Sequence, residues 1–406
     1  MKGKIHYAWF VCIGCALLLF CTSGLSVNSF TIYQPYILNL NSFTNSQSSM
    51  IITVRNLFSF ASLMLVNRYY KLMPKRIGMG LAGMFIVGGF VLFGFADSFA
   101  AYCCAAAVVG LGYGFGTMVP ITILISEWFS EKRNTAVGIC SAATGLSTLG
   151  IPSLISASIV KIGMRYTFWI EAAAIAVLVA VSFILIRNAP EDKGTTPYGT
   201  KTDAPQKKLS DIGIGKKDWI ILLPALLLIG AVMNVSYSHL TVHMTSAGFS
   251  AAEAALAVAV SGVVLTASKI IFGKLGDKKS NYVINYWFSA ILLSGLVLLC
   301  FIGKSKIIMY GSTMLYSFGL SFTAMGLAVW AGDLSAAKDY DRNVQLFQAL
   351  YSAGSLTFSS LPGIMADRFG GSYVPSYALF TVFAVYVIFA VQFLYIRIEK
   401  QRKISS

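Results

Sequence analysis

Two basic residues stand inside apolar stretches of the chain, where they could bind an anion. Lys269 interrupts the run that leads into GKLGDK, and Arg55 lies within SSMIITVRNLFSFASLML. A lysine at the centre of a membrane helix costs about 2.5 to 3.5 kcal/mol on insertion scales, so a cation kept there indicates a function. An ammonium attracts a carboxylate as a point charge, and a guanidinium grips one through two parallel hydrogen bonds. Both residues therefore predict contact with an anionic substrate.

Each cation also has a purely structural explanation. Lys269 lies only ~6 Å from the expected end of its helix, and a lysine can extend that far to reach the membrane surface. Arg55 could hold helix-end carbonyls or an acid on another helix, and Glu171 is one candidate partner. No acid lies within one turn of Lys269 in sequence, which leaves it free for an anionic ligand or for an acid from another helix.

Uncharged candidates for substrate contact are the polar or aromatic residues inside the apolar stretches, which could hydrogen-bond a carboxylate or shape a pocket. They are Asn28, Tyr33, Tyr113, Asn234, Tyr237, His239 and Tyr316. Any of them could instead join two helices by a hydrogen bond. His239 could also be a proton-linked switch, because imidazole titrates near neutral pH. We expect His243 at the outer surface.

The sequence around these residues is that of a membrane protein. Of its 406 residues 56% are hydrophobic and only 12% are charged, whereas a soluble globular chain carries about 25% charged residues. Long apolar runs predict twelve membrane-spanning helices, since an apolar segment in lipid must satisfy its own backbone hydrogen bonds. The expected limits are 8–32, 49–66, 77–96, 100–126, 135–160, 167–186, 219–242, 254–273, 282–302, 307–331, 344–366 and 374–396.

The formal charge of +15 could indicate a nucleic-acid partner, but the placement of the basic residues indicates membrane topology. With a cytoplasmic N-terminus, 24 of the 31 basic residues fall in cytoplasmic segments, five on the opposite face and two inside helices. The positive-inside rule predicts this bias, and it places both termini in the cytoplasm. We therefore expect a multi-pass protein of the cell membrane that contacts the lipid bilayer and binds no nucleic acid. The compact loops favour a bacterial inner membrane.

One polar segment divides the twelve spans six and six. Residues 188–218, NAPEDKGTTPYGTKTDAPQKKLSDIGIGKKD, are rich in Pro, Gly, Thr and Lys and predict a flexible cytoplasmic linker. We expect an N-terminal domain at 1–187 and a C-terminal domain with a short cytoplasmic tail at 219–406. The fifth and eleventh spans both contain Gly and Pro, and such interruptions at matching places indicate a repeat-built transporter with its site at the interface between halves.

Two further motifs have ordinary structural explanations. Gly110, Gly112, Gly114 and Gly116 superficially resemble a phosphate-binding loop, but they lie in an apolar span without a preceding strand and predict close helix packing. All seven cysteines fall in predicted spans and show no disulfide framework. The sequence has no paired carboxylates, Ser/His/Asp set or metal-ligand cluster, so we expect no catalytic chemistry, no metal and no cofactor.

Longer motifs carry a resemblance to a known family. GKLGDK, residues 273–278, is similar to the signature loop between the second and third helices of each half in the major facilitator superfamily. Other stretches resemble the branch of monocarboxylate porters and oxalate/formate antiporters: GLGYGFGTMVP (110–120), EWFSEKRNTAVGICSAATG (127–145), GMRYTF (163–168) and SHLTVHMTSAGFSAAEAALA (238–257). The resemblance covers nearly the whole chain. It implies an all-α membrane protein with twelve transmembrane helices in two pseudo-symmetric six-helix domains and the pathway between them.

The resemblance also implies roles for particular residues. Members of this branch place a cation four residues before the Gly that opens the loop, where it pairs with the substrate carboxylate. Lys269 and Gly273 have that spacing. Gly273, Asp277 and Lys278 would form a cytoplasmic charge clasp that controls the conformational change.

The chain departs from the family pattern in several places. In the first half, NRYYKL keeps Arg68 for the clasp but has Lys71 in place of Asp, which predicts a degenerate clasp. Leu265 stands where some monocarboxylate porters carry an acid or amide, Asn28 stands where some use a lysine, and helix eleven lacks the lysine of oxalate/formate antiporters. A substrate held by two widely spaced lysines is therefore not expected.

Together these patterns predict a secondary transporter that moves a mono- or dicarboxylate by alternating access, either as a proton-linked symporter or in exchange for another anion. Lys269 would be the main anion contact and Arg55 a second contact or gate. Acids are scarce in the spans, which argues against a proton pathway built on a buried acid. One alternative is a carrier for a neutral or cationic solute, such as a drug exporter, and another is a membrane sensor that transports nothing. The fourth span lacks the arginine usual in proton-driven exporters, and the linker and tail are short for a sensor.

Overall fold

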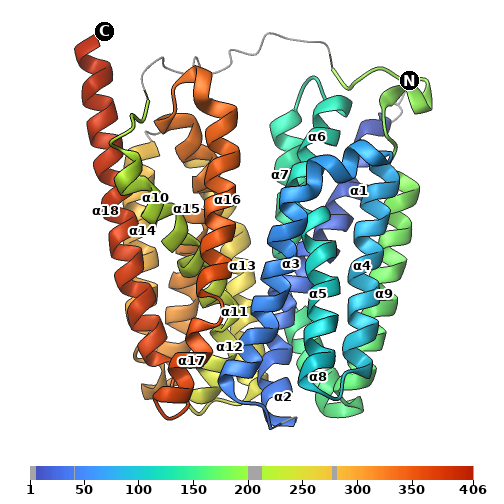
Figure 1. Ribbon diagram of the computed structural model, residues 1–406, viewed down its shortest axis with the longest axis vertical. Coiled ribbons are helices and arrows are strands. Elements are labelled where there is room, and N and C mark those ends of the chain that lie inside the picture. The colour runs from blue at the N-terminus through green and yellow to red at the C-terminus, as the bar shows by residue number, and fades with distance from the viewer. Residues whose placement is uncertain (1–5, 41, 200–212, 277–280, 406) are drawn as a thin grey trace. The chain divides into compact units, whose positions relative to one another are not determined.

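The computed structural model of the protein describes residues 6–40, 42–199, 213–276 and 281–405, which form helices joined by short connections (Figure 1). The chain divides into two compact units. The first comprises Met1–Phe43 and Met50–Ala204, and the second comprises Thr44–Ser49 and Pro205–Ser406. The described residues contain no strand, which confirms the all-helical fold class.

Ten helices in the described part of the chain are long and apolar enough to cross a membrane. They are Tyr7–Leu40, Asn45–Leu72, Lys75–Phe95, Phe99–Trp128, Thr135–Ile162, Met164–Leu185, Trp219–Ser238, Ala251–Lys269, Tyr282–Leu299 and Val374–Arg402. The tenth and eleventh predicted spans are also helical. They correspond to α15 (Lys306–Leu334) and to α16 (Tyr340–Phe358) with α17 (Leu361–Arg368). The twelve predicted spans thus all coincide with helices.

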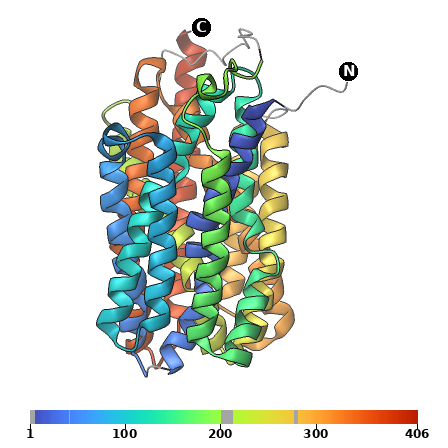
Figure 2. The same ribbon diagram turned by 90° about the vertical axis from the view of Figure 1, so that its right-hand side faces the viewer.

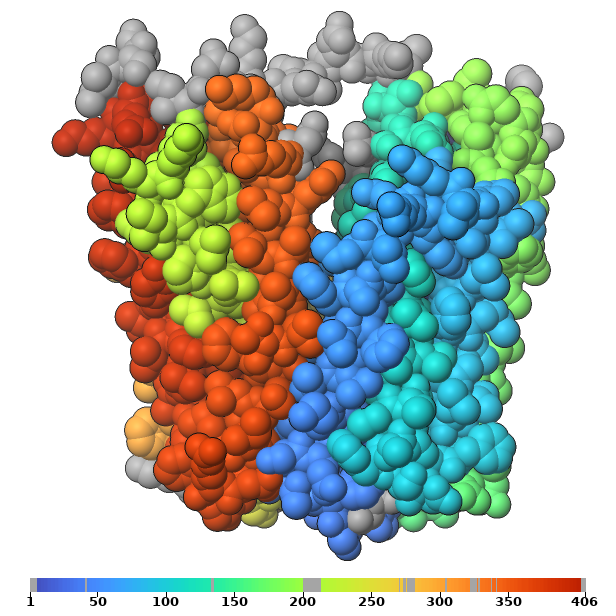
Figure 3. All heavy atoms as spheres, in the orientation of Figure 1, coloured from blue at the N-terminus to red at the C-terminus, as the bar shows by residue number. Residues whose placement is uncertain are grey.

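Long helices run alongside one another in the first unit. Its elements are α1 (Tyr7–Leu19), η1 (Phe20–Asn28), η2 (Ser29–Ile32), α2 (Tyr33–Leu40), α3 (Asn45–Leu72), α4 (Lys75–Phe95), α5 (Phe99–Phe115), α6 (Met118–Trp128), α7 (Arg133–Leu146), α8 (Ile151–Ile162), α9 (Met164–Leu185) and η3 (Pro190–Lys193). Helix α4 packs against both α5 and α9, and the three lie side by side in both views (Figures 1 and 2). Figure 3 shows the side chains of α3, α4 and α5, blue to cyan, covering this face of the unit.

The second unit repeats this arrangement of long and broken helices. Its elements are α10 (Trp219–Gly230), η4 (Ala231–Val235), α11 (Ser236–Ser238), α12 (Leu240–Ser246), α13 (Ala251–Gly276), α14 (Asn281–Leu299), η5 (Ile302–Lys304), α15, η6 (Ala337–Asp339), α16, α17 and α18 (Val374–Ser405). Helix α15 packs against α13 and α14, and α10 packs against α16 and α18.

The first helix of each unit contains a π-helical segment. Segment η1 follows α1 in the first unit, and η4 follows α10 in the second. A π turn joins residues five apart rather than four, and such turns are frequent at functional sites. Asn28, Asn234 and Tyr237, all predicted to contact substrate, lie in or directly after these segments.

The fifth and eleventh spans are both broken, at the breakers noted in the sequence. Helices α7 and α8 meet at Gly150, whose φ of 76° belongs to the left-handed region that favours glycine. Helices α16 and α17 meet at two serines. Pro152 and Pro362 each stand in the first turn of the second piece, where the missing N–H of proline is tolerated.

The glycines of the fourth span pack helices together, as predicted. A Cβ added at Gly110 would lie 2.4 Å from the backbone oxygen of Arg55 on α3, and one at Gly114 would lie 1.8 Å from Ser62 Oγ on the same helix. Gly112 faces α4 in the same way, and Gly116 faces Thr22 of η1. Small residues therefore let α5 approach its neighbours closely.

Part of the predicted linker is held against the first unit. The Tyr198 N–H donates to the Trp128 carbonyl at 2.8 Å, and the Tyr198 carbonyl accepts from the N–H groups of Ser130 and Glu131 at 3.0 Å. The Tyr198 ring packs beside Trp9 at 5.7 Å between centres. Residues 188–199 are thus attached to the ends of the first unit's helices rather than free along the whole predicted length.

The close packing of α5 on α3 can be tested with a single methyl group. Gly114→Ala should lower the stability of the detergent-solubilised protein by about 1 to 3 kcal/mol, because the new Cβ overlaps Ser62 and the Ser59 carbonyl. Thermal unfolding followed by cysteine-reactive fluorescence would measure the change.

Gly138→Ala is the matched control. Gly138 lies in a helix of the same unit, and a Cβ there meets nothing within 4 Å. Alanine at this position should be neutral or stabilising, because it removes the helix penalty of glycine. Equal unfolding temperatures for the two variants would contradict close packing at Gly114.

Candidate functional site

Arg55 is enclosed by protein, although no acid among the described residues pairs with it. The residue is 3% exposed. Nη1 donates to the Ser26 carbonyl at 3.1 Å, and Nη2 lies 3.5 Å from Asn56 Oδ1. The guanidinium carbon lies 5.8 Å from the centre of the Phe30 ring, within cation–π range. Nε has no hydrogen-bond partner, and no ion pair within the described ranges includes Arg55.

The π-helical segment η1 supplies the shortest contact of Arg55. At the end of η1 the Ser29 N–H donates to the Gly24 carbonyl five residues earlier, instead of to a carbonyl four residues earlier as in an α-helix. Ser26, whose carbonyl binds Arg55, lies inside this π-helical stretch. Tyr113 of α5 lies beside Arg55. The structure therefore brings together Arg55 and Tyr113, two of the predicted substrate contacts.

Two other predicted contacts of the first unit join helices to one another. Asn28 Nδ2 donates to the Thr144 carbonyl of α7 at 3.1 Å. Tyr33 is fully buried, and its hydroxyl donates to Glu171 Oε2 of α9 at 2.6 Å. Glu171 was a candidate partner for Arg55, and this assignment is wrong: among the described residues it pairs with Tyr33 instead. Tyr33 and Glu171 are 138 residues apart, so no local pattern reveals the pair.

Lys269, the main predicted anion contact, lies half-buried in α13. No hydrogen bond or ion pair of its ammonium occurs within the described residues. The lysine is therefore free of a protein counter-charge there, as the sequence indicated, and its role as an anion contact stays a prediction.

The remaining candidates of the second unit cluster near η4. Tyr316 of α15 is hydrogen-bonded to Ser236 Oγ, and its hydroxyl lies 3.4 Å from the Val232 carbonyl. Asn234 Oδ1 accepts from Ser238 Oγ at 3.3 Å. The Tyr237 hydroxyl is buried and lacks a hydrogen-bond partner. Tyr237 thus has a polar atom that no hydrogen bond within the described residues uses.

His243 is buried, not at the outer surface as expected. Its Nε2 lies 2.8 Å from the Leu299 carbonyl at the end of α14, and its ring stacks on Tyr377 with 4.0 Å between centres. The carbonyl pairs with one ring nitrogen, whereas Nδ1 is buried without a hydrogen-bond partner among the described residues. This carbonyl lies 56 residues away in sequence. The polar composition of α12 could not reveal that partner.

His239 is also buried, and both of its ring nitrogens are used. Nδ1 lies 2.9 Å from the Val235 carbonyl, and Nε2 lies 2.9 Å from Ser49 Oγ. Ser49 belongs to the short segment of α3 that groups with the second unit. With Nδ1–H donating and Nε2 accepting, these bonds fit a neutral ring that joins elements of the second unit.

The conformational clasp predicted for the second half is only partly described. Gly273 lies inside α13, whereas Asp277 and Lys278 fall outside the described residues. In the first half Arg68 is exposed. There Lys75, at the start of α4, pairs with Glu127, at the end of α6. Glu127 lies 52 residues from Lys75 and outside the loop motif, so the motif could not reveal this pair.

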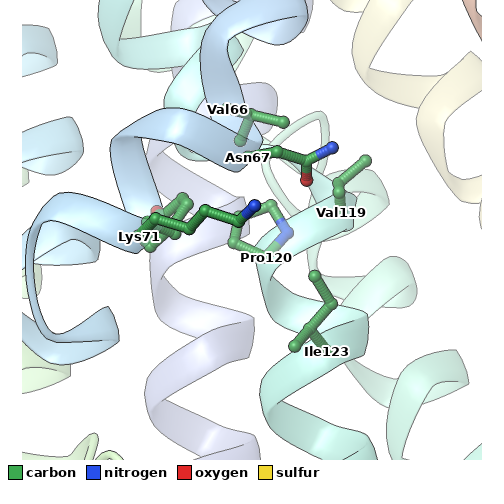
Figure 4. Close-up of a pocket in the computed structure, with 7 residues that line it drawn as sticks. Val66, Asn67, Lys71, Val119, Pro120 and Ile123 are labelled. Atoms are coloured by element: carbon green, nitrogen blue, oxygen red, sulfur yellow. The ribbon is translucent and has the colours of Figure 1, made fainter.

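A cavity of about 330 Å³ lies between side chains of α3 and α6. It is lined by Val66, Asn67, Tyr70, Lys71, Val119, Pro120 and Ile123. Figure 4 shows the Lys71 side chain reaching across toward Pro120. None of the predicted substrate contacts lines this cavity, so it is separate from the Arg55 and Tyr113 pair.

Comparison with known families gives one match over most of the chain. The family model described as Major Facilitator Superfamily matches residues 15–336. That range begins in α1 and extends beyond α15, so it includes helices of both units.

Curated relatives are distant but cover much of the chain. The aspyridones efflux protein of Emericella nidulans is 20% identical, over 90% of this chain and 73% of its own length. Monocarboxylate transporter 12 of Mus musculus is 22% identical over 72% of this chain, which spans 66% of that relative. The oxalate:formate antiporter of Oxalobacter formigenes is 21% identical, over 91% and 84%. The predicted resemblance to this branch is thus confirmed among the relatives.

Solved structures confirm the fold. The nucleoside transporter NupG superposes with a TM-score of 0.73 at 13% identity and covers 96% of this chain and 100% of its own. The D-xylose-proton symporter gives a TM-score of 0.72 at 14% identity, with 94% and 96% covered.

The Lys75 and Glu127 pair gives a prediction that tests its geometry. Lys75 stands at a helix N-terminus and Glu127 at a helix C-terminus, so both charges oppose the helix dipoles. Their side chains are 27% and 40% exposed, and either single reversal, Lys75→Glu or Glu127→Lys, should lower stability by roughly 0.5 to 1 kcal/mol.

The double reversal should restore stability to the wild-type value or above it, because it re-forms the pair and complements both dipoles. Thermal unfolding of the four proteins forms a double-mutant cycle. Additive losses in the double variant would show that the two side chains do not interact.

Proposed function

We propose, from the premise that the chain belongs to the Major Facilitator Superfamily, that it moves a small organic anion across the membrane by alternating access. The protein is a multi-pass membrane transporter of that family and not an enzyme. The anion would be a mono- or dicarboxylate. Its transport would be linked to a proton or to a counter-anion.

This proposal rests on one observation, which is that the buried guanidinium of Arg55 has no acidic partner among the described residues. A guanidinium at 3% exposure without a neighbouring acid leaves a positive charge that the described part of the protein does not neutralise. Such a charge is costly inside a membrane helix unless something else compensates it. A carboxylate substrate would supply the missing negative charge, and Tyr113 would donate a further hydrogen bond to it.

Lys269 would be the main anion contact in the second unit. It is a half-buried cation within an apolar helix and has no ion pair among the described residues. In this proposal Arg55 and Lys269 are the cations that bind the anion. Asn28, Tyr33, Asn234, Tyr237, His239 and Tyr316 would position helices or substrate around the two cations.

The relatives support a carboxylate without identifying one. Two of them are named for monocarboxylate and for oxalate and formate. Another is named as an efflux protein for aspyridones, which favours the alternative of a solute exporter. The distribution of Lys and Arg places both termini in the cytoplasm in this proposal, and the compact loops favour a bacterial inner membrane.

Transport by purified protein in proteoliposomes is the direct test. Wild-type protein should take up a labelled carboxylate from a panel of mono- and dicarboxylates with saturable kinetics. Lys269→Ala should abolish that uptake, and Arg55→Gln should lower it at least tenfold, since each removes a charge that binds the substrate.

Lys306→Ala and Arg165→Gln are matched controls. Lys306 is an exposed lysine of the second unit paired with Glu253 at 2.6 Å, and Arg165 is an exposed arginine of the first unit beside Trp169. Both variants should transport as wild type does. Saturable carboxylate uptake by Lys269→Ala would refute its role as the main contact. Wild-type flux of cations or neutral solutes alone would favour the exporter, and binding without any flux would favour a sensor.

Binding can also be measured without reconstitution. A carboxylate at one hundred times its Kd should stabilise the folded protein by about 2.7 kcal/mol and so raise its unfolding temperature. Arg55→Gln should lose this stabilisation while remaining folded in the absence of ligand. An equal thermal shift in Arg55→Gln and wild type would show that Arg55 does not contact the anion.

A further inference from the structure

Glu171 is a buried carboxyl that the proposed carboxylate contacts do not use. It lies in the second turn of α9 and is 8% exposed. Oε2 accepts a hydrogen bond from the Tyr33 hydroxyl at 2.6 Å, whereas Oε1 is buried without a partner. An ionised carboxylate accepts several hydrogen bonds, so this environment satisfies only a small part of its capacity.

The surroundings of the carboxyl are aromatic. The Tyr33 ring stacks on Phe168, one turn before Glu171 on the same helix, with ring centres 4.0 Å apart and planes 12° apart. Phe93 of α4 stacks on Phe168 from 5.3 Å. These rings exclude water and fix the Tyr33 hydroxyl on Oε2, so the charge of an ionised Glu171 would face apolar groups.

No cation compensates Glu171 from the elements packed on α9, which are α1, α4, α8 and η1. The titratable groups nearest to it are Tyr33 and Cys21. Lys161 and Arg165, at the ends of α8 and α9, are exposed. Lys75 and Arg76 of α4 contact Glu127 and Phe183 respectively, away from the second turn of α9.

The carboxyl is nevertheless linked to the anion contact of the same unit. The Phe30 ring lies 5.9 Å from the Tyr33 ring and 5.8 Å from the Arg55 guanidinium carbon. Phe30, Tyr33 and the Ser26 carbonyl that holds Arg55 all belong to one broken helix, η1–η2–α2. A change of charge at Glu171 therefore acts on the helix that positions Arg55.

We propose that Glu171, oriented by Tyr33, is a proton-binding site that couples anion transport to the pH gradient. The inference rests on the proposed function and specifies its coupling ion. Arg55 and Glu171 are coupled through the broken helix that both contact, so anion binding at Arg55 favours the protonated form of Glu171. By linkage, protonation favours anion binding to the same extent. Substrate and proton then cross together, and the proton leaves Glu171 when the anion leaves Arg55.

This inference changes an expectation drawn from composition. Acids are scarce in the spans, and this argued against a buried acid as a proton site. The structure places one such acid in an aromatic environment with a single hydrogen-bond donor. One carboxyl is sufficient for a carrier that moves one proton in each cycle.

Glu171→Gln in proteoliposomes tests the coupling, because the amide mimics the neutral acid. The variant should lose accumulation driven by an inward proton gradient but keep exchange of labelled for unlabelled carboxylate, which needs no net proton movement. Glu253→Gln, at a partly exposed acid at the start of α13 that pairs with Lys306, should keep both activities. Gradient-driven accumulation by Glu171→Gln equal to wild type would overturn the proposal.

Infrared spectroscopy tests proton binding even if the protein carries no carboxylate. The difference between wild type and Glu171→Gln should contain a protonated carboxyl band that titrates between about pH 5 and 9, the range that buried carboxyls reach. Tyr33→Phe should shift that band, because it removes the hydrogen bond. A wild type without carboxylate flux but with this band would refute the proposed substrate and retain the proton site. A missing band, or one that does not titrate, would overturn the site itself.

Discussion

A charge inside a membrane helix has to be held by the protein, because lipid offers it neither water nor counter-ions. The first unit meets this requirement for Arg55 with a backbone carbonyl, an amide oxygen and an aromatic face, and without an acid in the described residues. The π-helical segment, the close approach of α5 and the position of Phe30 all serve the same enclosure. Neutral dipoles stabilise the guanidinium while leaving its net charge available to a ligand.

The fold could be predicted from the sequence because lipid makes hydropathy informative. Twelve apolar runs became helices, and the breakers near Gly150 and Pro362 became real breaks. The α16–α17 pair is less apolar than the other spans, since it carries several small and polar residues. Small and polar residues are tolerated in a helix that packs much of its surface against other helices, so the mean hydropathy of such a helix is low.

The candidate site was less predictable, because its partners come from distant parts of the chain. Lys269 and Arg55 were recognisable as cations inside apolar helices, but Glu171, the candidate partner of Arg55, pairs with another residue. Glu171 pairs with Tyr33 through an aromatic stack that depends on how α2 meets α9. His243 is buried because one carbonyl of α14 reaches it. Periodicity reports which face of a helix is apolar, and it does not report which polar groups of other helices meet that face.

Because the first helix of each unit contains a π turn, the number of residues in that turn determines which way the following side chains point. A helix advances about 100° per residue, so adding or removing one residue rotates everything beyond it by that angle. In η1 the extra residue per turn sets the direction in which Tyr33 points, and hence whether it meets Glu171 at all. Homologous carriers that differ here by a single insertion or deletion would present different side chains at the same depth, and so differ in what they carry without any change of fold.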